Sequence, residues 1–190
     1  MNYNIFIFHG TGGNPEENWF PWIKKKLEES GCKVFIPRFP TPEGQSLEAW
    51  FKVLEAYRKN INKDTIFIGH SLGGLFLLRL LEWLPTKVKA VFFTGTPIGV
   101  RPIKNYDSDN LFGEGFDFEW EKIKKKSDRF TVFHSDNDPY VSLANGEGLA
   151  KHLGVKLSLI HNAGHFNAKA GYLKFEELWE ELHKIIIMEQ

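Results

Sequence analysis

The sequence is poor in cysteine, in net charge and in long apolar runs, and each shortage excludes a class of protein. Cys32 is the only cysteine among 190 residues, so an internal disulfide framework cannot form. Twenty-four basic residues balance 24 acidic ones, which disfavours nucleic acid or an anionic membrane as the partner. We therefore expect a small-molecule partner, and the sequence gives no sign for or against a protein partner.

No apolar run approaches the roughly 18 to 20 residues that a membrane span requires. The run Ile185–Met188 is better explained as the inner face of a terminal helix. The first residues, Met1–Asn4, lack the basic region and the apolar stretch of a secretory signal. These features predict a cytoplasmic protein without a membrane association.

Apolar residues are plentiful enough to build a sizeable core. Hydrophobic residues make up 42% of the chain and aromatic residues 15%, with 17 phenylalanines among them. A chain of this length fits one domain, since domains commonly run about 100 to 200 residues. Because the sequence also contains no repeat, linker or low-complexity segment, we expect residues 1–190 to form a single domain.

Short apolar runs alternate with segments of helical periodicity along the whole chain. The apolar runs are continuous, as is typical of parallel strands that are covered on both faces. Alternation of this kind predicts a doubly wound α/β domain. The expected strands span residues 3–8, 33–37, 65–69, 88–94, 129–134 and 155–160, and the expected helices span residues 18–29, 47–60, 72–84, 118–126, 143–153 and 175–187.

Prolines and glycines agree with these boundaries. Pro21 suits a first helical turn, and Gly31 and Gly154 fall where helices should end. Residues 95–116 are the one long segment that we expect to be irregular. This segment is too short for a separate cap domain, although residues 97–116 could serve as a lid.

Gly69, Ser71 and Gly73 form a Gly-x-Ser-x-Gly pattern between an expected strand and an expected helix. This strand-turn-helix context is the setting of a nucleophile elbow. The turn is tight, so the glycines remove Cβ atoms that would collide. Ser71 would then project beyond the strand ends, with the amide of Leu72 placed to stabilise an oxyanion. The alternative is an ordinary glycine-rich helix entry with a capping serine.

A second glycine-rich segment, residues 9–13, follows the first expected strand. Its glycines, Gly12 among them, let the backbone approach a substrate, and the amide of Thr11 is our candidate for a second oxyanion donor. A phosphate-binding loop is a weak alternative, because the segment lacks both the Gly-Lys-Ser/Thr ending and a Gly-x-Gly-x-x-Gly pattern. We expect His9 to brace the loop rather than to catalyse.

His165 is the best candidate for a general base among seven histidines. In enzymes whose serine lies on such an elbow, the acid and then the histidine follow on loops after late strands. His165 lies in a loop between the sixth expected strand and the last expected helix. His161 is the weaker choice because it lies too near the strand end.

The acid should follow the fifth expected strand, where Asp136 and Asp138 lie. Such a carboxylate would hold the imidazole of His165 in the required tautomer. Spacing alone does not choose between the two. Pro139 favours Asp138, because it restricts the backbone of the preceding residue, whereas Asp136 suits a turn. Metal binding by the clustered aspartates is disfavoured, since no further ligands have metal-like spacing.

These motifs together resemble the small serine hydrolases related to retinoblastoma-binding protein 9, which are α/β-hydrolases without a substantial cap. The resemblance spans nearly the whole chain and implies Ser71 as nucleophile, Asp138 as acid and His165 as base. It also implies a six-stranded sheet of order 2-1-3-4-5-6 and esterase activity on short acyl esters. The matching segments are Asn-Trp-Phe-Pro-Trp at 18–22, Gly-His-Ser-Leu-Gly-Gly at 69–74, Ser-Asp-Asn-Asp-Pro-Tyr-Val at 135–141 and Gly-His-Phe at 164–166.

The sequence therefore predicts a serine hydrolase that needs no cofactor or metal, and more narrowly a carboxylesterase. A thioesterase, a lactonase or a small-peptide hydrolase would use the same residues, and a protein-binding module could keep the fold without useful turnover. Trp19 and Trp50 are candidates for the wall of the substrate pocket, although core packing explains either residue as well.

Overall fold

Six strands form one parallel sheet in the computed structural model, which describes residues 3–187 apart from the side chains of residues 113 and 114. The strand order is β2-β1-β3-β4-β5-β6, as predicted, and every predicted strand end lies within two residues of the observed one. The strands are β1 (Asn4–Phe8), β2 (Lys33–Phe35), β3 (Thr65–His70), β4 (Ala90–Thr94), β5 (Phe130–Ser135) and β6 (Leu157–Ile160).

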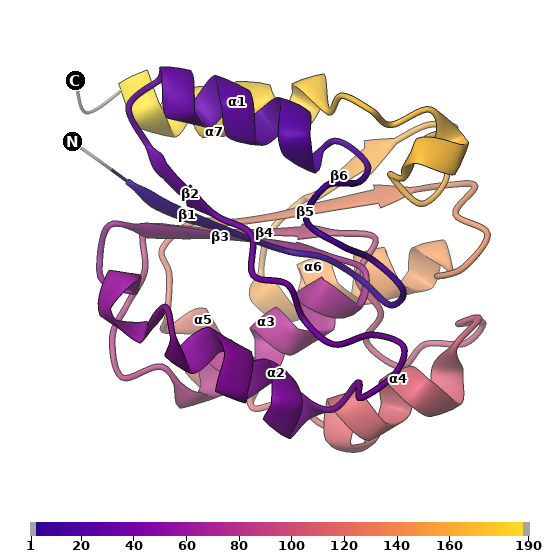
Figure 1. Cartoon of the computed structure of the whole chain (residues 1–190). Coiled ribbons are helices and arrows are strands. Elements are labelled where there is room, and N and C mark those ends of the chain that lie inside the picture. The colour runs from indigo at the N-terminus through magenta and orange to yellow at the C-terminus, as the bar shows by residue number, and fades with distance from the viewer. Residues whose placement is uncertain (1–2, 188–190) are drawn as a thin grey trace.

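Helices cover both faces of the sheet (Figure 1). One face carries the first and last helices, and the other face carries the five between them. This three-layer arrangement confirms the predicted α/β class. The helices are α1 (Phe20–Glu29), α2 (Leu47–Glu55), α3 (Leu72–Trp83), α4 (Tyr106–Gly113), α5 (Trp120–Lys124), α6 (Leu143–Leu153) and α7 (Glu176–Ile187), with short 3-10 turns at Arg58–Asn60, Glu114–Phe116 and Ala168–Ala170.

The central strands supply apolar side chains to both layers. In β1, Phe6 and Phe8 pack toward α3, whereas Ile5 and Ile7 pack toward the layer that contains α1 and α7. Successive side chains of a strand point to opposite faces, so an uninterrupted apolar run serves both faces at once. The core is therefore divided into two halves by the sheet.

The segment that we predicted to be irregular, residues 95–116, contains α4. This prediction was wrong because α4 has little apolar periodicity. Phe112 is its buried apolar residue, packed edge-on against Trp50 at 4.8 Å between ring centroids, whereas Leu111 is 82% exposed. A helix attached at one apolar point does not produce the repeating pattern on which a sequence-based assignment depends.

No helix in the described part of the chain is long and apolar enough to cross a membrane. In α7, Ile185 and Ile186 are buried, which confirms the predicted inner face at these two positions, whereas Ile187 is half exposed and does not belong to it. Met188, the fourth residue of that predicted face, lies outside the described residues, as do Met1 and Asn2 of the N-terminal segment.

Helix α3 approaches β1 closely because its first turn contains two glycines, Gly73 and Gly74. A Cβ atom at Gly73 would lie 2.1 Å from the carbonyl oxygen of Phe8 and 2.6 Å from that of His9. Both neighbours are backbone atoms of a central strand or its end, so they cannot move aside. The contact requires glycine at position 73 and fixes the start of α3 against the sheet.

We expect Gly73→Ala to lower the free energy of unfolding by about 1 to 3 kcal/mol, because the methyl group overpacks this contact. Urea denaturation measures the change. Gly148→Ala is the matched control, because the closest atom to its added methyl group would be the flexible Cδ1 of Ile98 at 2.9 Å. Equal stability of the Gly73 variant and the wild type would contradict the packing argument.

Candidate active site

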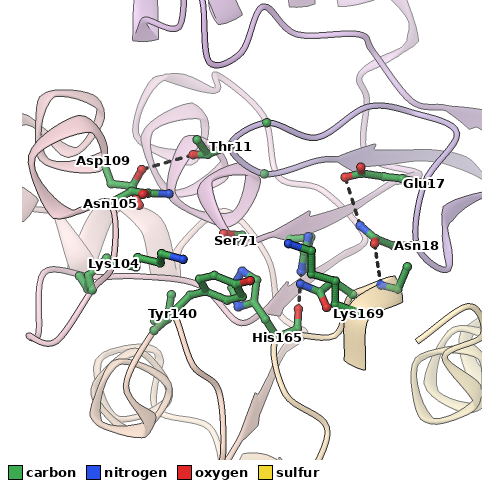
Figure 2. Close-up of a pocket in the computed structure, with 17 residues that line it drawn as sticks. Thr11, Glu17, Asn18, Ser71, Lys104, Asn105, Asp109, Tyr140, His165 and Lys169 are labelled. Carbon is green, nitrogen blue, oxygen red and sulfur yellow. Dashed lines mark hydrogen bonds between the residues drawn. The ribbon is translucent and has the colours of Figure 1, made fainter. Parts of the chain in front are cut away.

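The carboxyl ends of the parallel strands lie along one edge of the sheet, and a cavity of about 360 Å³ opens there. The loops after β1, β3, β5 and β6 contribute to its wall, together with residues in and before α4. Ser71, His165, Thr11 and Gly12 all line this cavity (Figure 2). Ligands of open parallel sheets bind in this kind of crevice.

Ser71 occupies a strained turn between β3 and α3. Its φ of 54° and ψ of −124° place a non-glycine residue in a sparsely populated region, at a cost of about 1 to 3 kcal/mol. The Ser71 amide donates to the carbonyl of Thr94 at 2.9 Å, and its carbonyl accepts from Gly74 at 2.9 Å. A Cβ at Gly10 would lie 2.7 Å from the Ser71 Cβ, so the neighbouring loop also requires glycine.

His165 and Asp138 form a short hydrogen bond beside Ser71. The distance from His165 Nδ1 to Asp138 Oδ2 is 2.6 Å, and the aspartate side chain is fully buried. An ionised carboxylate only accepts hydrogen bonds, so Nδ1 carries the proton and Nε2 keeps a lone pair. No hydrogen bond joins Ser71 to the imidazole among the described residues, although both line the same cavity.

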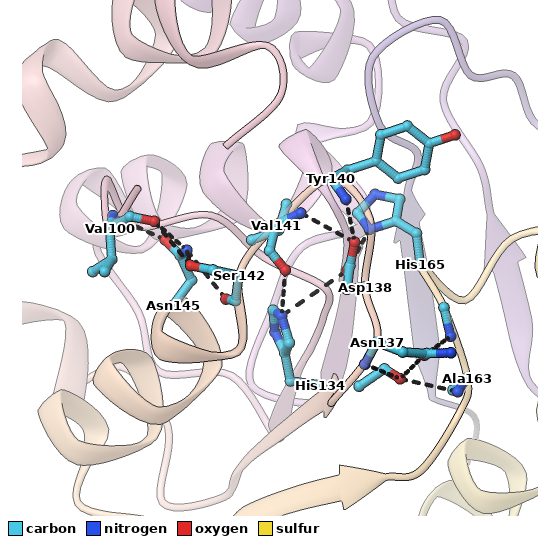
Figure 3. A network of polar contacts seen from close by, with 12 residues as sticks. Val100, His134, Asn137, Asp138, Tyr140, Val141, Ser142, Asn145, Ala163 and His165 are labelled. Atoms are coloured by element: carbon cyan, nitrogen blue, oxygen red, sulfur yellow. Dashed lines mark hydrogen bonds and ion pairs between the residues drawn. The ribbon is translucent and has the colours of Figure 1, made fainter. Parts of the chain in front are cut away.

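Asp138 stays ionised because several donors surround it. Burial alone would raise the pKa of its carboxyl group, but the hydrogen bonds from His165 and from the amides of Tyr140 and Val141 outweigh burial and lower this pKa below its usual value. The two amides lie 2.8 and 3.0 Å from Oδ1. Oδ2 is thus left for the imidazole (Figure 3).

The loops after β5 and β6 are joined by further hydrogen bonds in Figure 3. The hydroxyl of Ser135 accepts the amide of Ala163 at 2.9 Å, and the side-chain carbonyl of Asn137 accepts the amide of Gly164 at 2.7 Å. The second contact joins the residues directly before His165 and Asp138, and the first joins Ala163 to Ser135, the last residue of β5. We call them the loop clamp, because they fix the distance between the two residues.

Asp136 makes a different pair on the surface. Its Oδ2 lies 2.6 Å from His161 Nδ1, and its Oδ1 accepts the amide of Asn162 at 2.9 Å. The His161 side chain is 72% exposed, and neither residue lines the cavity. Its sequence context predicted hydrogen bonds to amides of its own turn, but Asp136 instead joins the loop after β5 to residues 161 and 162 after β6.

The loop after β1 is held in place on both sides. The amide of Phe39 donates to His9 Nε2 at 3.1 Å, so Nδ1 carries the proton and donates to Gly10 O at 3.0 Å. This hydrogen bonding agrees with the predicted role of His9 as a brace of the loop.

The backbone amides of this loop differ in their partners. The Gly12 amide donates to the hydroxyl of Thr41, whereas the Thr11 amide has no acceptor among the described residues. Leu72 begins α3, where an amide lacks an intrahelical partner.

Trp19 and Trp50 do not line the cavity, which corrects their suggested role as pocket walls. Both are fully buried, one in each half of the core. The indole of Trp19 donates to Phe166 O at 3.0 Å, and that of Trp50 donates to Pro40 O at 2.9 Å. Each indole is thus satisfied by backbone, as is usual for a core tryptophan.

Sequence reasoning missed several polar residues of the cavity, among them Lys104, Asp109 and Lys169. Lys104 precedes α4 and Asp109 lies within it, so their place depends on how α4 docks. Lys169 lies in a 3-10 turn after His165. No local pattern marks these residues. Within the described chain, no group of three or more His, Cys, Asp or Glu side chains could hold a metal ion.

His70, also missed, precedes Ser71 and is buried, with 4% of its surface exposed. Its Nε2 donates to the carbonyl of His165 at 2.8 Å. Burial, with a smaller contribution from the nearby His165, lowers the pKa of His70 to about 3. The imidazole is therefore neutral at ordinary pH and holds the His165 backbone next to the elbow.

Comparison with known proteins agrees with this fold. A family model described as "Serine hydrolase" matches residues 5–184. YdeN of Bacillus subtilis (strain 168) is 26% identical over 96% of this chain and 95% of its own, and the crystal structure of the ydeN gene product superposes with a TM-score of 0.89 at 25% identity, over 97% and 98% of the two chains. Serine hydrolase RBBP9 of Rattus norvegicus is 26% identical over 84% of this chain and 85% of its own.

We expect His70 to make the protein sensitive to acid. In the unfolded state the His70 imidazole is protonated near pH 6.5, whereas in the native state it stays neutral down to about pH 3. Stability is therefore lost as the pH falls through this window, by up to about 1.4 kcal/mol per pH unit. His70→Gln, which keeps a donor for His165 O, should flatten the dependence of unfolding free energy on pH between 6.5 and 4.

His183→Gln is the matched control, because His183 is exposed on α7. Urea denaturation at several pH values should give this variant the wild-type slope. If both variants, or neither, changed the slope, the acid sensitivity would not come from His70.

Proposed function

The chain belongs to the serine hydrolase family, and from this premise we propose that it is a carboxylesterase that acts on small esters with short acyl groups. One observation carries the proposal. Ser71 lies on a strained elbow in the cavity that it shares with His165, whose Nδ1 is 2.6 Å from the buried Asp138. A hydroxyl, an imidazole and a carboxylate in this order form a nucleophile with its base.

The proposed reaction has two steps. The Ser71 oxygen attacks the acyl carbon while Nε2 of His165 takes the hydroxyl proton, and the imidazolium then gives this proton to the departing alcohol oxygen. Water, deprotonated by the same imidazole, then attacks the acyl carbon. The bond from this carbon to the Ser71 oxygen breaks, the imidazolium returns the proton to that oxygen, and the carboxylic acid leaves. Throughout, Asp138 stays ionised and stabilises the transient positive charge on His165.

The amides of Thr11 and Leu72 are our candidates for the oxyanion hole. Two features support this assignment: the Thr11 amide has no acceptor among the described residues, and the Leu72 amide lies at the amino end of α3, where the helix dipole favours negative charge. Donors of this kind stabilise the tetrahedral oxyanion more than the planar ester.

The size and lining of the cavity support small substrates. Its volume of about 360 Å³ is at the low end of the range of about 300 to 1,000 Å³ for small-molecule sites. The branched aliphatic side chains in its wall are those of Ile103 and Val141, and most of the other lining residues are polar. A long acyl chain would find little apolar surface there.

We expect kcat/KM for p-nitrophenyl esters to fall from acetyl and butyryl toward palmitoyl, because burial of a long chain needs apolar wall that the cavity lacks. Ser71→Ala should lower kcat by about 10⁴- to 10⁶-fold and abolish labelling by a fluorophosphonate probe. Esters of increasing chain length, assayed in parallel with thioesters and peptides, measure the preference. Higher kcat/KM on long chains, or persistent labelling of the variant, would overturn the assignment.

Asp138→Asn should lower kcat by roughly 10⁴-fold without unfolding the protein, because an amide favours the wrong tautomer of His165. Asp136→Asn is the matched control, and we expect it to lower kcat by less than about tenfold, since Asp136 faces solvent and pairs with His161. Steady-state kinetics compare the two variants, and circular dichroism checks their fold. The opposite ranking would move the acid to Asp136.

A further inference from the structure

Asp109 is a buried carboxylate that the proposed reaction does not use. It lies on α4, is 4% exposed and lines the same cavity as Ser71 and His165. The hydroxyl of Thr11 donates a hydrogen bond to Oδ1 of Asp109, at the long distance of 3.4 Å (Figure 2). Oδ2 has no partner among the described residues.

A carboxylate in this position is costly unless it receives hydrogen bonds. Each of its oxygens accepts two, and burial without partners costs several kcal/mol in the charged form. In agreement, burial raises the pKa of Asp109 to about 6, although the Thr11 hydrogen bond and the nearby His165 oppose the rise. One weak contact does not explain why a carboxylate, rather than an apolar residue, occupies this wall.

The position of Asp109 next to Thr11 restricts what it could bind. Thr11 supplies one of the two amides that we assign to the oxyanion hole, and its side chain contacts Asp109. A substrate whose carbonyl oxygen lies at the Thr11 amide therefore has its neighbouring atoms close to Asp109. A hydrogen-bond donor on one of these neighbouring atoms would supply the partner that Oδ2 of Asp109 lacks.

We propose that Asp109 is a specificity-determining residue that binds a hydrogen-bond donor, an ammonium or a hydroxyl group, on the acyl part of the substrate close to its carbonyl. The proposal rests on the proposed function and narrows its substrate class to amino- and hydroxy-acyl esters. The ionised carboxylate binds an ammonium group more strongly than a hydroxyl group. In the ammonium contact both donor and acceptor are charged, whereas in the hydroxyl contact only the carboxylate is charged.

The other charged groups of the cavity do not neutralise Asp109. The ammonium group of Lys104 lies over the ring of Tyr140, 4.8 Å from its centroid, and neither Lys104 nor Lys169 has an ion pair among the described residues. Glu17, the other acid of the wall, receives hydrogen bonds from Asn14 and Asn18. His165 is committed to Asp138. Asp109 is thus the acid that is left without close partners.

The test compares three p-nitrophenyl esters that differ at one atom of the acyl group: butyrate, 2-hydroxybutyrate and 2-aminobutyrate. We expect wild-type kcat/KM to be about tenfold or more higher for each donor-bearing ester than for butyrate, after correction for spontaneous hydrolysis. The preference for 2-aminobutyrate should grow as the pH rises from 5 to 7, because Asp109 ionises in that range. The ratio of two kcat/KM values cancels any effect of pH that is common to the two esters.

Asp109→Asn should remove most of the preference for 2-aminobutyrate and its dependence on pH. Asp107→Asn, an exposed acid on the same helix, and Glu17→Gln, the other acid of the cavity, are the matched controls and should keep both. Only the ratio of kcat/KM for 2-aminobutyrate to that for butyrate is compared between variants, so a general loss of activity in one variant does not affect the comparison. Thermal melting checks that each variant is folded.

Three outcomes would overturn the inference. If wild-type protein hydrolyses butyrate and is labelled at Ser71 but shows no preference for either donor, the proposed function stands and the role of Asp109 fails. If Asp109→Asn keeps the preference, another group binds the donor and Asp109 serves to attach α4 to the loop of Thr11. If neither hydrolysis nor labelling occurs, the proposed function fails first and this inference fails with it.

Discussion

The hydrogen bond between His165 and Asp138 depends on the distance between two loops that are 27 residues apart in the sequence. The loop clamp sets this distance, because Ser135 and Asn137 accept amides from the loop of His165 immediately before the imidazole. Asp138 in turn is kept ionised by two amides of its own turn. The polar side chains between β5 and Asp138 are therefore structural requirements of the pair, and not a cluster of interchangeable acids and amides.

Much of the fold and of the candidate site follows from the sequence where the signal is local. The apolar runs of the strands are local, so the strands were predicted from them, whereas the strand order came from the family resemblance. Gly69 and Gly73 mark the elbow because a Cβ atom at either position would collide with backbone. His165 was predicted from its position after the sixth strand, and Asp138 was chosen over Asp136 because of Pro139 and the family resemblance. Their hydrogen bond agrees with the assignment, while their catalytic roles await the experiments above.

What the sequence could not supply depends on contacts between distant segments. Trp19 and Trp50 were assigned to the pocket on residue type alone, and type does not distinguish a wall from a core. Helix α4 was missed because Phe112 is its single apolar anchor. Asp109 was missed with it, since the cavity acquires this carboxylate only when α4 docks beside the loop of Thr11.

These differences divide the cavity into two parts with different physical origins. The groups to which we assign the reaction follow the ends of β3, β5 and β6, which the paired sheet and the loop clamp hold in place. The wall that faces them comes from α4 and the residues just before it. Helix α4 is attached through Phe112, through the long hydrogen bond between Thr11 and Asp109, and through a hydrogen bond from Gln45 to the hydroxyl of Ser108 at 3.0 Å. Strongly held groups suit chemistry, which tolerates little displacement, and a helix outside the sheet that is attached through a few side chains suits recognition, because its residues can change without disturbing the sheet. The specificity of this hydrolase should therefore be determined in α4, and its chemistry in the strand ends.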